Sequence, residues 1–320
     1  MAVTIIIPIF NAERFLARCI ESCLQQTLKD IKIILINDGS TDSSLDICKH
    51  YASEHSQIRL IDKRNSGVAD TRNHGIKSAD SEYIMFCDAD DYLNPNVCER
   101  LYFEAQKGYD LVTCGFSTVS ETGKQENWGV EHRLIYTKDE IPLAVAELKR
   151  VNGLFVCWNK IFRKDKILEM FPEGSSFAED SIFVMRYLKQ CDNIALLPDI
   201  GYYYWTQTEN SAMKRYHKGM AQMLTQEYDE IILLLGKNST FANEHLIENV
   251  CYFLFPALYN NNEMQPSERV GAIAYISRFL KQNNIKRMTK PMRRKYRCVM
   301  MIVCSALNPN IKSILLSVLY

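Results

Sequence analysis

A chain of 320 residues is long enough for one large domain or for a domain with an extension, and 47% apolar with 24% charged residues is the composition of a globular protein. No uncharged apolar run reaches about 18 residues, so no transmembrane helix is expected. The formal net charge is zero, but the last acidic residue is Glu268, and the first 268 residues hold 27 basic and 38 acidic side chains, a charge of −11. The eleven lysines and arginines that follow indicate an anionic partner for the C-terminal part, either a membrane or a nucleic acid.

The eleven cysteines include no C-x-x-C pair, which predicts reduced, mostly buried thiols in a cytosolic protein. Cys19 and Cys23 lie four residues apart on an expected helix, where they would be neighbouring core positions. The six histidines form no ligand-like cluster, so no zinc site is expected. No signal peptide precedes the first strand, which agrees with the cytosolic interpretation.

Strand and helix patterns alternate through the first 90 residues. Apolar, β-branched runs predict strands, and apolar residues at helical spacing or after a capping residue predict helices. The strands are expected at 3–9, 31–36, 58–61 and 82–86, and the helices at 12–26, 43–54 and 68–78. This order is typical of βαβ units in a parallel sheet with right-handed crossovers.

Polar residues stand where three of these strands end: Asn11, Asp38 and Asp88. The carboxyl ends of parallel strands lie at one rim of the sheet, where open α/β folds bind ligands. No G-x-G-x-x-G and no G-x-x-x-x-G-K-[ST] pattern follows the first strand. A phosphate-bearing ligand would therefore need another anchor, such as a metal ion on the acidic cluster.

That cluster is Asp88-Ala89-Asp90-Asp91, three carboxylates within four residues directly after a buried strand. Like charges this close raise one another's pKa unless a cation joins them. One or two carboxylates together with substrate phosphates form a typical site for a hard divalent ion. The alternative interpretation is a solvated acidic turn that caps the helix expected after Pro95.

Further along, the sequence predicts a strand at 111–119, a polar loop at 121–130, a short strand at 132–136, a capping box at 137–140 before a helix at 141–150, and strands at 194–197 and 201–205. Glu179 and Asp180 would lie in the first turn of another helix. Simple complementarity to the helix dipole is the alternative explanation for this acidic pair.

The character changes after residue 215. Helical periodicity at 219–235, 241–259 and 267–282 predicts a small helical appendage. Seven basic residues then fall within 286–297, followed by apolar segments at 298–307 and 311–320. This combination is typical of an interfacial membrane anchor, whereas a last helix packed on the domain with a solvated basic face is the alternative. A nucleic-acid partner is not expected, because the basic residues alternate with aliphatic rather than aromatic side chains.

Taken together, seven motifs resemble those of the family 2 inverting glycosyltransferases with a GT-A fold. They occur in the family's order: IIIPIFN at 5–11, NDGSTD at 37–42, RNSGV at 64–68, TRNHGI at 71–76, DADD at 88–91, WNK at 158–160 and ED at 179–180. The resemblance covers 3–205 and implies an α/β fold, a Rossmann-like, mostly parallel sheet flanked by helices. It leads us to expect a catalytic domain at 1–214, a helical appendage at 215–285 and a basic, apolar tail at 286–320.

The resemblance also implies residues that bind the nucleotide of the donor. Phe10 stands where an aromatic residue lines the base pocket, next to Pro8 at the end of the first strand. Asp38 would accept a hydrogen bond from the uracil imide N–H. Asn65 and Arg72 would contact the nucleotide.

In the acidic cluster, the resemblance implies that Asp90 ligates Mn²⁺ or Mg²⁺ on the diphosphate. Asp88 would bond the ribose or approach the metal, Ala89 would line the donor site, and Asp91 would lie near the donor sugar. Each of these roles belongs to one donor, a UDP-sugar.

Asp180 would be the catalytic base of the transfer, with Glu179 supporting it or binding the acceptor. The helix N-terminus is expected to keep Asp180 ionised.

These observations predict an inverting, metal-dependent transferase that moves a sugar from a UDP-sugar to a glycan or polyprenyl-linked acceptor at the inner face of the cell membrane, in polysaccharide synthesis. Nucleotidyl transfer to a sugar phosphate is a second hypothesis, against which Phe10-Asn11-Ala12-Glu13 stands in place of a Gly-rich basic loop. A non-catalytic sugar-nucleotide or membrane-binding scaffold is a third, and it predicts UDP binding without turnover.

Overall fold

The computed structural model describes residues 1–320 except 176, 207–216, 261–263, 286–293 and 320. The chain divides into two compact units, Met1–Thr208 and Glu209–Tyr320. The domain boundary expected at 214/215 falls outside the described residues, as does most of the basic run expected at 286–297.

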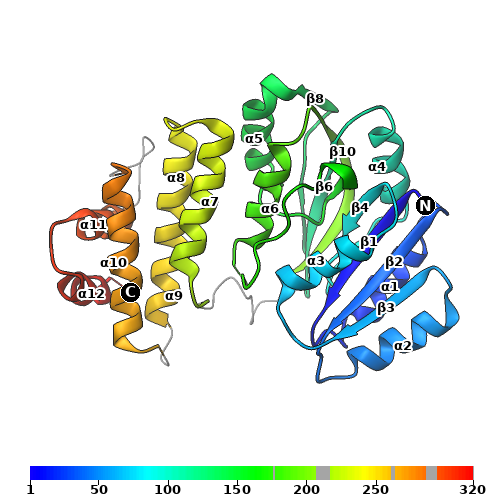
Figure 1. Ribbon diagram of the computed structural model, residues 1–320, viewed down its shortest axis with the longest axis horizontal. Helices are drawn as coiled ribbons and strands as arrows, with labels where there is room; N and C mark the ends of the chain where they lie inside the picture. Colours follow the sequence, from blue (N-terminus) through cyan, green and yellow to red (C-terminus); the bar gives the residue numbers. More distant parts are fainter. Residues whose placement is uncertain (176, 207–216, 261–263, 286–293, 320) are drawn as a thin grey trace. The chain divides into compact units, whose positions relative to one another are not determined.

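Within the described residues of the first unit, ten strands form one sheet in the order β3-β2-β1-β4-β9-β6-β10-β5, with β7 beside β6 and β8 beside β10 (Figure 1). The strands are β1 (Val3–Ile9), β2 (Ile31–Asp38), β3 (Ile58–Lys63), β4 (Tyr83–Phe86), β5 (Tyr92–Leu93), β6 (Leu111–Ser120), β7 (Gln125–Trp128), β8 (Leu134–Thr137), β9 (Lys160–Arg163) and β10 (Asn193–Thr206).

The first four strands in chain order, β1 to β4, are parallel, as predicted, and the expected crossover helices connect them. The second half of the sheet differs, because β9 lies antiparallel to both β4 and β6, and β5, β7 and β8 also pair antiparallel to their neighbours. The sheet as a whole is therefore mixed, with a parallel half that carries the predicted rim.

Helices cover both faces of this sheet. They are α1 (Leu16–Leu24), α2 (Ser44–Glu54), α3 (Val68–Ser78), α4 (Val97–Ala105), α5 (Ile141–Arg150) and α6 (Glu179–Leu188), with 3₁₀ turns at Lys138–Glu140 and Lys164–Lys166.

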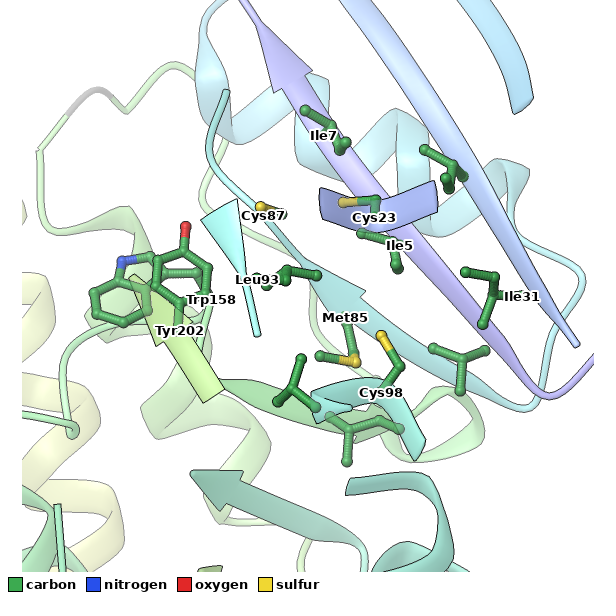
Figure 2. Close-up of a cluster of buried hydrophobic side chains, with 14 of the residues drawn as sticks. Ile5, Ile7, Cys23, Ile31, Met85, Cys87, Leu93, Cys98, Trp158 and Tyr202 are labelled. Carbon is green, nitrogen blue, oxygen red and sulfur yellow. The ribbon is translucent and has the colours of Figure 1, made fainter. Parts of the chain in front are cut away.

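Alternate residues of β1 point to opposite faces, as strand geometry requires. Ile5 and Ile7 belong to the core that α1, α2 and α4 cover, together with Cys23 and Met85 (Figure 2). Ile6 instead meets α3, so closely that a Cβ added at Gly75 would lie 2.3 Å from the Ile6 Cγ2 atom. A glycine at this position therefore allows α3 to lie directly on β1, near the acidic turn formed by residues 88–91.

Two details of the second half depart from the sequence prediction, and one agrees. The strands expected at 194–197 and 201–205 are one long strand, β10, with register shifts near Ile200. The polar segment 121–130, expected to be a loop, contains β7, so that prediction was wrong. β7 is a largely exposed edge strand, and its polar side chains lack the apolar alternation by which a strand is predicted. The capping box is confirmed, because Glu140 Oε2 accepts from the Thr137 backbone N–H at 3.0 Å.

The described residues of the second unit are helical: α7 (Met220–Leu235), α8 (Thr240–Asn249), a π-helical segment (Val250–Leu254), α9 (Phe255–Asn260), α10 (Pro266–Gln282), α11 (Arg294–Cys304) and α12 (Pro309–Ser317). Side-chain caps explain two of the starts, since Ser239 accepts from the Ala242 N–H and Asn308 from the Asn310 N–H. Among the residues that the structure describes, none of the helices combines the length and the apolarity that crossing a bilayer would take.

Candidate active site

The loops that follow β1 and β2 are joined at the predicted rim of the sheet. Asn11, in the left-handed region with φ 50°, accepts a 2.8 Å hydrogen bond from the Thr41 N–H. Glu13 and Asp42 complete the connection, because Asp42 accepts from the Glu13 N–H at 3.0 Å and Glu13 accepts from the Ser43 N–H at 2.8 Å. The two strand ends therefore form one continuous edge.

Asp38, at the end of β2, is buried and fastens the next loop to this edge. Its carboxylate accepts from the Ser66 N–H at 2.9 Å and from the Gly67 N–H at 3.0 Å, and it forms an ion pair with Lys63. Bonds between a carboxylate and backbone amides fix position strongly. Sequence reasoning missed Lys63, because only its position at the end of β3 distinguishes it from other lysines in the sequence.

The other residues predicted to bind the nucleotide lie around Asp38. Phe10 is 53% exposed, Asn65 is exposed, and Pro8 is half-buried within β1. The Asn65 backbone lies against the β2 end: a Cβ added at Gly39, which has φ +68°, would be 2.8 Å from the Asn65 N atom. The structure therefore brings these residues to the same edge as Asp38.

Arg72, on α3, joins the two acidic segments that are most distant in sequence. Its Nη1 atom lies 2.6 Å from Asp180 Oδ1 and 3.2 Å from Glu179 Oε1, and its Nη2 atom lies 2.9 Å from Asp88 Oδ1. The guanidinium is 4% exposed and lies over the Phe171 ring. One buried cation thus gathers the three carboxylates that the sequence placed on two separate elements.

Backbone contacts explain how α6 reaches this position. The side-chain amide of Asn73, next to Arg72, donates to the Phe171 carbonyl at 3.0 Å and accepts from the Phe171 N–H at 2.9 Å. The segment then turns at Ala178, whose φ of 59° is unusual for a residue with a Cβ, and α6 begins at the next residue. Strain of this kind is common next to functional residues.

Burial dominates the electrostatics of Asp180. It raises the pKa of this carboxyl to about 7; Arg72 acts to lower the pKa, whereas the charges of Glu179 and Asp88 raise it further. The expectation that the helix N-terminus keeps Asp180 ionised is therefore met only in part at neutral pH, because burial opposes the charged form. A carboxyl with a pKa near neutral pH is suited to accept and release a proton.

Asp90 is the second carboxylate of the acidic turn. Burial and the neighbouring Asp88 charge raise the pKa of Asp90 to about 6. Its own backbone N–H lowers the pKa in part, but no other described residue donates a hydrogen bond to this carboxylate, whereas the Asp90 carbonyl accepts from Arg18 at 2.7 Å. Asp88 is 25% exposed and has one oxygen on Arg72. Asp88 and Asp90 could therefore hold a hard divalent cation.

Asp91 is fully buried and ties the acidic turn to β10. Its two oxygens accept from the Tyr202 hydroxyl and from the Trp205 N–H, each at 2.7 Å, and burial raises the pKa of Asp91 well above its usual range. The Tyr202 hydroxyl also accepts from the Asp88 N–H at 3.1 Å. Ala89, two residues before Asp91, is also buried. Sequence reasoning missed this role of Tyr202, because an apolar strand pattern does not reveal which tyrosine meets an acid.

Lys160 and Arg18 are further polar residues near the site that the sequence did not single out by chemistry. Lys160 is completely buried and donates to the carbonyls of Gly153 and Val156 and to the Asn159 side chain; burial lowers the pKa of Lys160 to about 7. Arg18 stacks over the Trp205 ring at 4.4 Å. Arg18 thus joins α1 to the acidic turn and to β10, and Lys160 fixes the loop between α5 and β9.

Comparisons with known proteins agree with this geometry. A sequence model described as glycosyl transferase family 2 matches residues 4–171. The chain is 32% identical over 273 residues to the uncharacterized glycosyltransferase EpsJ of Bacillus subtilis, covering 83% of this chain and 79% of EpsJ. It is 28% identical over 221 residues to the poly(ribitol-phosphate) beta-glucosyltransferase of Bacillus spizizenii, covering 67% of this chain and 33% of that protein.

Among solved structures, residues 1–349 of S. aureus TarS in complex with UDP-GlcNAc superimpose with a TM-score of 0.74 at 19% identity, covering 99% of this chain and 90% of that one. At this identity the likeness shows the fold, which is the GT-A fold with helices after the unit that carries the sheet.

Proposed function

The chain belongs to glycosyl transferase family 2, and from this premise we propose that it is an inverting enzyme that transfers a hexosyl group from a UDP-sugar to a hydroxyl of a glycan or polyprenyl-linked acceptor. The observation that carries the proposal is the Arg72 centre. It holds Asp88, from the end of β4, and Asp180, from the start of α6, on two nitrogens of one guanidinium. In a single displacement, the carboxylate that binds the donor and the carboxylate that activates the acceptor must lie close to each other.

The UDP-sugar is supported on two grounds. The buried Asp38 lies at the strand edge with Phe10 exposed beside it, which suits a base pocket with an acceptor for an imide N–H. TarS, which shares the fold, was crystallised with UDP-GlcNAc. We propose UDP as the nucleotide and leave the sugar to be identified by assay.

Asp88 and Asp90 would hold Mn²⁺ or Mg²⁺, and the donor set fits such an ion. Oxygen ligands suit hard cations, and no other described residue donates a hydrogen bond to the Asp90 carboxylate. Arg72 brings one positive charge to Asp88, Glu179 and Asp180, so the site retains an excess of negative charge. When bound, the ion offsets the negative charge that UDP gains on departure.

Asp180 is the proposed general base. An acceptor hydroxyl loses its proton only as it attacks, so the base must stand next to it and be ready to accept the proton near neutral pH. The pKa of about 7 and the fixed position on Arg72 suit this role. Attack from the side of Asp180, opposite the departing UDP, inverts the anomeric carbon. Glu179, 3.2 Å from Arg72, supports the base or binds the acceptor.

We also propose that the enzyme acts at the inner face of the cell membrane, in the synthesis of a cell-surface polysaccharide. The exposed apolar side chains in and next to the last two helices support this: Met301, Leu307, Ile311, Ile314, Leu315 and Val318. Exposed Lys295 and Arg297 lie on α11, and no acidic residue follows Glu268. Apolar and basic residues combined in this way favour an anionic lipid surface.

Turnover tests the proposal directly. Purified enzyme is incubated with Mn²⁺, a panel of UDP-sugars and lipid-linked or glycan acceptors, and UDP release is measured. We expect release with one donor, and a loss of at least about 100-fold in Asp90→Asn and in Asp180→Asn. Asp165→Asn, a change of the same chemistry at an exposed ion pair, should retain activity. Equal turnover in all four proteins would contradict the assignment, and release of pyrophosphate from UTP would favour nucleotidyl transfer.

A further inference from the structure

Three cysteine thiols meet directly behind the acidic turn. Cys19 and Cys23 come from successive turns of α1, and Cys87 comes from the end of β4, next to Asp88. Their Sγ atoms all lie within 4.8 Å of one another, and the Cys19 and Cys87 Sγ atoms are 3.6 Å apart. All three residues are completely buried, and Figure 2 shows Cys23 and Cys87 in the core between α1 and the sheet.

The sequence suggested only two of these thiols, as neighbouring core positions on a helix. The third lies 64 residues beyond Cys23 along the chain, and only the packing of α1 on β4 brings it into the group. Within the part of the chain that the structure describes, this is the one group of three potential metal ligands with such spacing. The eight other cysteines, Cys48 on α2 among them, lie outside it.

We propose that Cys19, Cys23 and Cys87 bind one thiophilic divalent ion of the Zn²⁺ or Cd²⁺ type, and that its binding inhibits the enzyme. A metal–sulfur distance of about 2.3 Å places thiolates around one ion about 3.8–4.0 Å apart, close to the separations in this cluster. Soft sulfur ligands select such ions over the hard Mg²⁺ and Mn²⁺. A divalent ion also neutralises two of the three buried thiolates, whereas a monovalent ion would leave two charges uncompensated.

Each metal–sulfur bond replaces an S–H bond, and the three protons pass to solvent. No electrons are transferred. The structure shows what these protons do before the ion binds: the Cys19 Sγ donates to the Asp88 carbonyl at 3.4 Å, and the Cys87 Sγ donates to the same oxygen at 3.7 Å. Metal binding removes both donors and leaves that carbonyl facing thiolate sulfur, which repels it.

The consequence follows from the position of Asp88. Its carbonyl loses two hydrogen bonds while its carboxylate is held by Arg72, so the acidic turn must shift relative to the Arg72 centre. The inhibitory effect rests on the proposed function, whereas binding of the ion does not. A soft ion would therefore act from behind the turn and would not compete with the UDP-sugar.

Binding is tested first, on the full reduced chain, by titration with Cd²⁺ in an oxygen-free buffer while thiolate-to-metal charge-transfer absorption is recorded. We expect one tight site per chain in the wild type and in Cys48→Ala, which removes a buried thiol of the same core. Cys19→Ala, Cys23→Ala and Cys87→Ala should each weaken the site by about 100-fold, because one of three ligands is lost. Wild-type affinity in all three variants, or no saturable absorption in the wild type, would overturn the proposal.

Cys23→Ala carries the second test, since Cys23 has no hydrogen bond to Asp88 and should leave turnover without cadmium unchanged. Stoichiometric Cd²⁺ in excess Mn²⁺ should then inhibit the wild type and Cys48→Ala, and spare Cys23→Ala. Inhibition of all three proteins alike would place the ion at the carboxylates and contradict the proposal. A wild type that binds Cd²⁺ at these cysteines but transfers no sugar would instead count against the proposed function alone.

Discussion

At the scale of single residues, Arg72 explains more of the site than any carboxylate does. The sequence predicted it as a nucleotide contact because of its place in a motif. In the structure, its two terminal nitrogens are occupied by Asp88, Glu179 and Asp180. Sequence spacing could not reveal this, because the three acids approach through the fold from 16 to 108 residues away. A planar, fork-shaped cation is required for contacts in two directions at once.

We therefore predict that Arg72→Lys lowers kcat/KM by at least about 100-fold, although it keeps the charge, because a single ammonium cannot hold both acidic segments. Steady-state kinetics with the identified donor measures the effect. Arg59→Lys, at an exposed arginine that donates to the Ser78 carbonyl, is the matched control and should remain active. Activity of Arg72→Lys within threefold of the wild type would show that the Arg72 centre is not needed.

At the scale of elements, local sequence signals determined the strands of the parallel half and the capped helix after β8 well. The predicted strand at 3–9 is β1, and the capped helix at 141–150 is α5. Local sequence signals failed for strands whose formation depends on pairing with distant parts of the chain. β7 is polar because it is an exposed edge strand, and β9 is short and lies between two antiparallel neighbours. The acidic pair was placed correctly in the first turn of α6, but no pattern indicated the left-handed Ala178 before it.

That left-handed residue gives a stability prediction. With φ at 59°, the Cβ of Ala178 is strained, so Ala178→Gly should raise the free energy of unfolding by up to about 1 kcal/mol. Ala146→Gly, at an exposed position inside α5, should lower it by about 1 kcal/mol, since glycine there only loses helix propensity. Urea unfolding followed by circular dichroism compares the two. A destabilised Ala178→Gly variant would show that the turn is not strained.

Lys160, on β9, gives a prediction about pH. Burial lowers its pKa from 10.5 to about 7, so between about pH 7 and 10 the unfolded chain binds more protons at this residue than the folded chain. The stability contributed by this group therefore rises with pH across that interval, by at most about 1.4 kcal/mol per pH unit. Lys160→Met should reduce this slope relative to the wild type. Urea unfolding at pH 7, 8 and 9 measures both slopes, and parallel slopes would mean that Lys160 stays charged in the folded protein.

At the scale of the whole molecule, charge is divided along the chain. The sequence predicted a basic, apolar end, and the described part of that end presents apolar side chains to solvent on α11 and α12. Lys312, on α12, differs from the exposed basic residues of this end, because its side chain is buried and donates a hydrogen bond to the Val303 carbonyl. Hydropathy along the chain does not reveal this bond, because it depends on how α12 packs on α11.

If these helices meet a lipid surface, the double variant Ile314→Glu with Val318→Glu should reduce binding to anionic vesicles by at least about tenfold, because two exposed apolar contacts are lost and two like charges are added. Flotation with vesicles that contain phosphatidylglycerol measures the bound fraction. Leu233→Glu, at another exposed apolar position of the same unit, is the control and should bind as the wild type does. Equal flotation of all three proteins would refute a role of α12 at the membrane.

One crystal structure tests the central claim of convergence most directly: the enzyme with its UDP-sugar, or with UDP, and Mn²⁺. We predict manganese within ligand distance of Asp90 or Asp88 and of the diphosphate oxygens, with the Asp180 carboxylate on the opposite side of the sugar-binding position. Manganese bound away from both aspartates, or a diphosphate remote from the Arg72 centre, would contradict it.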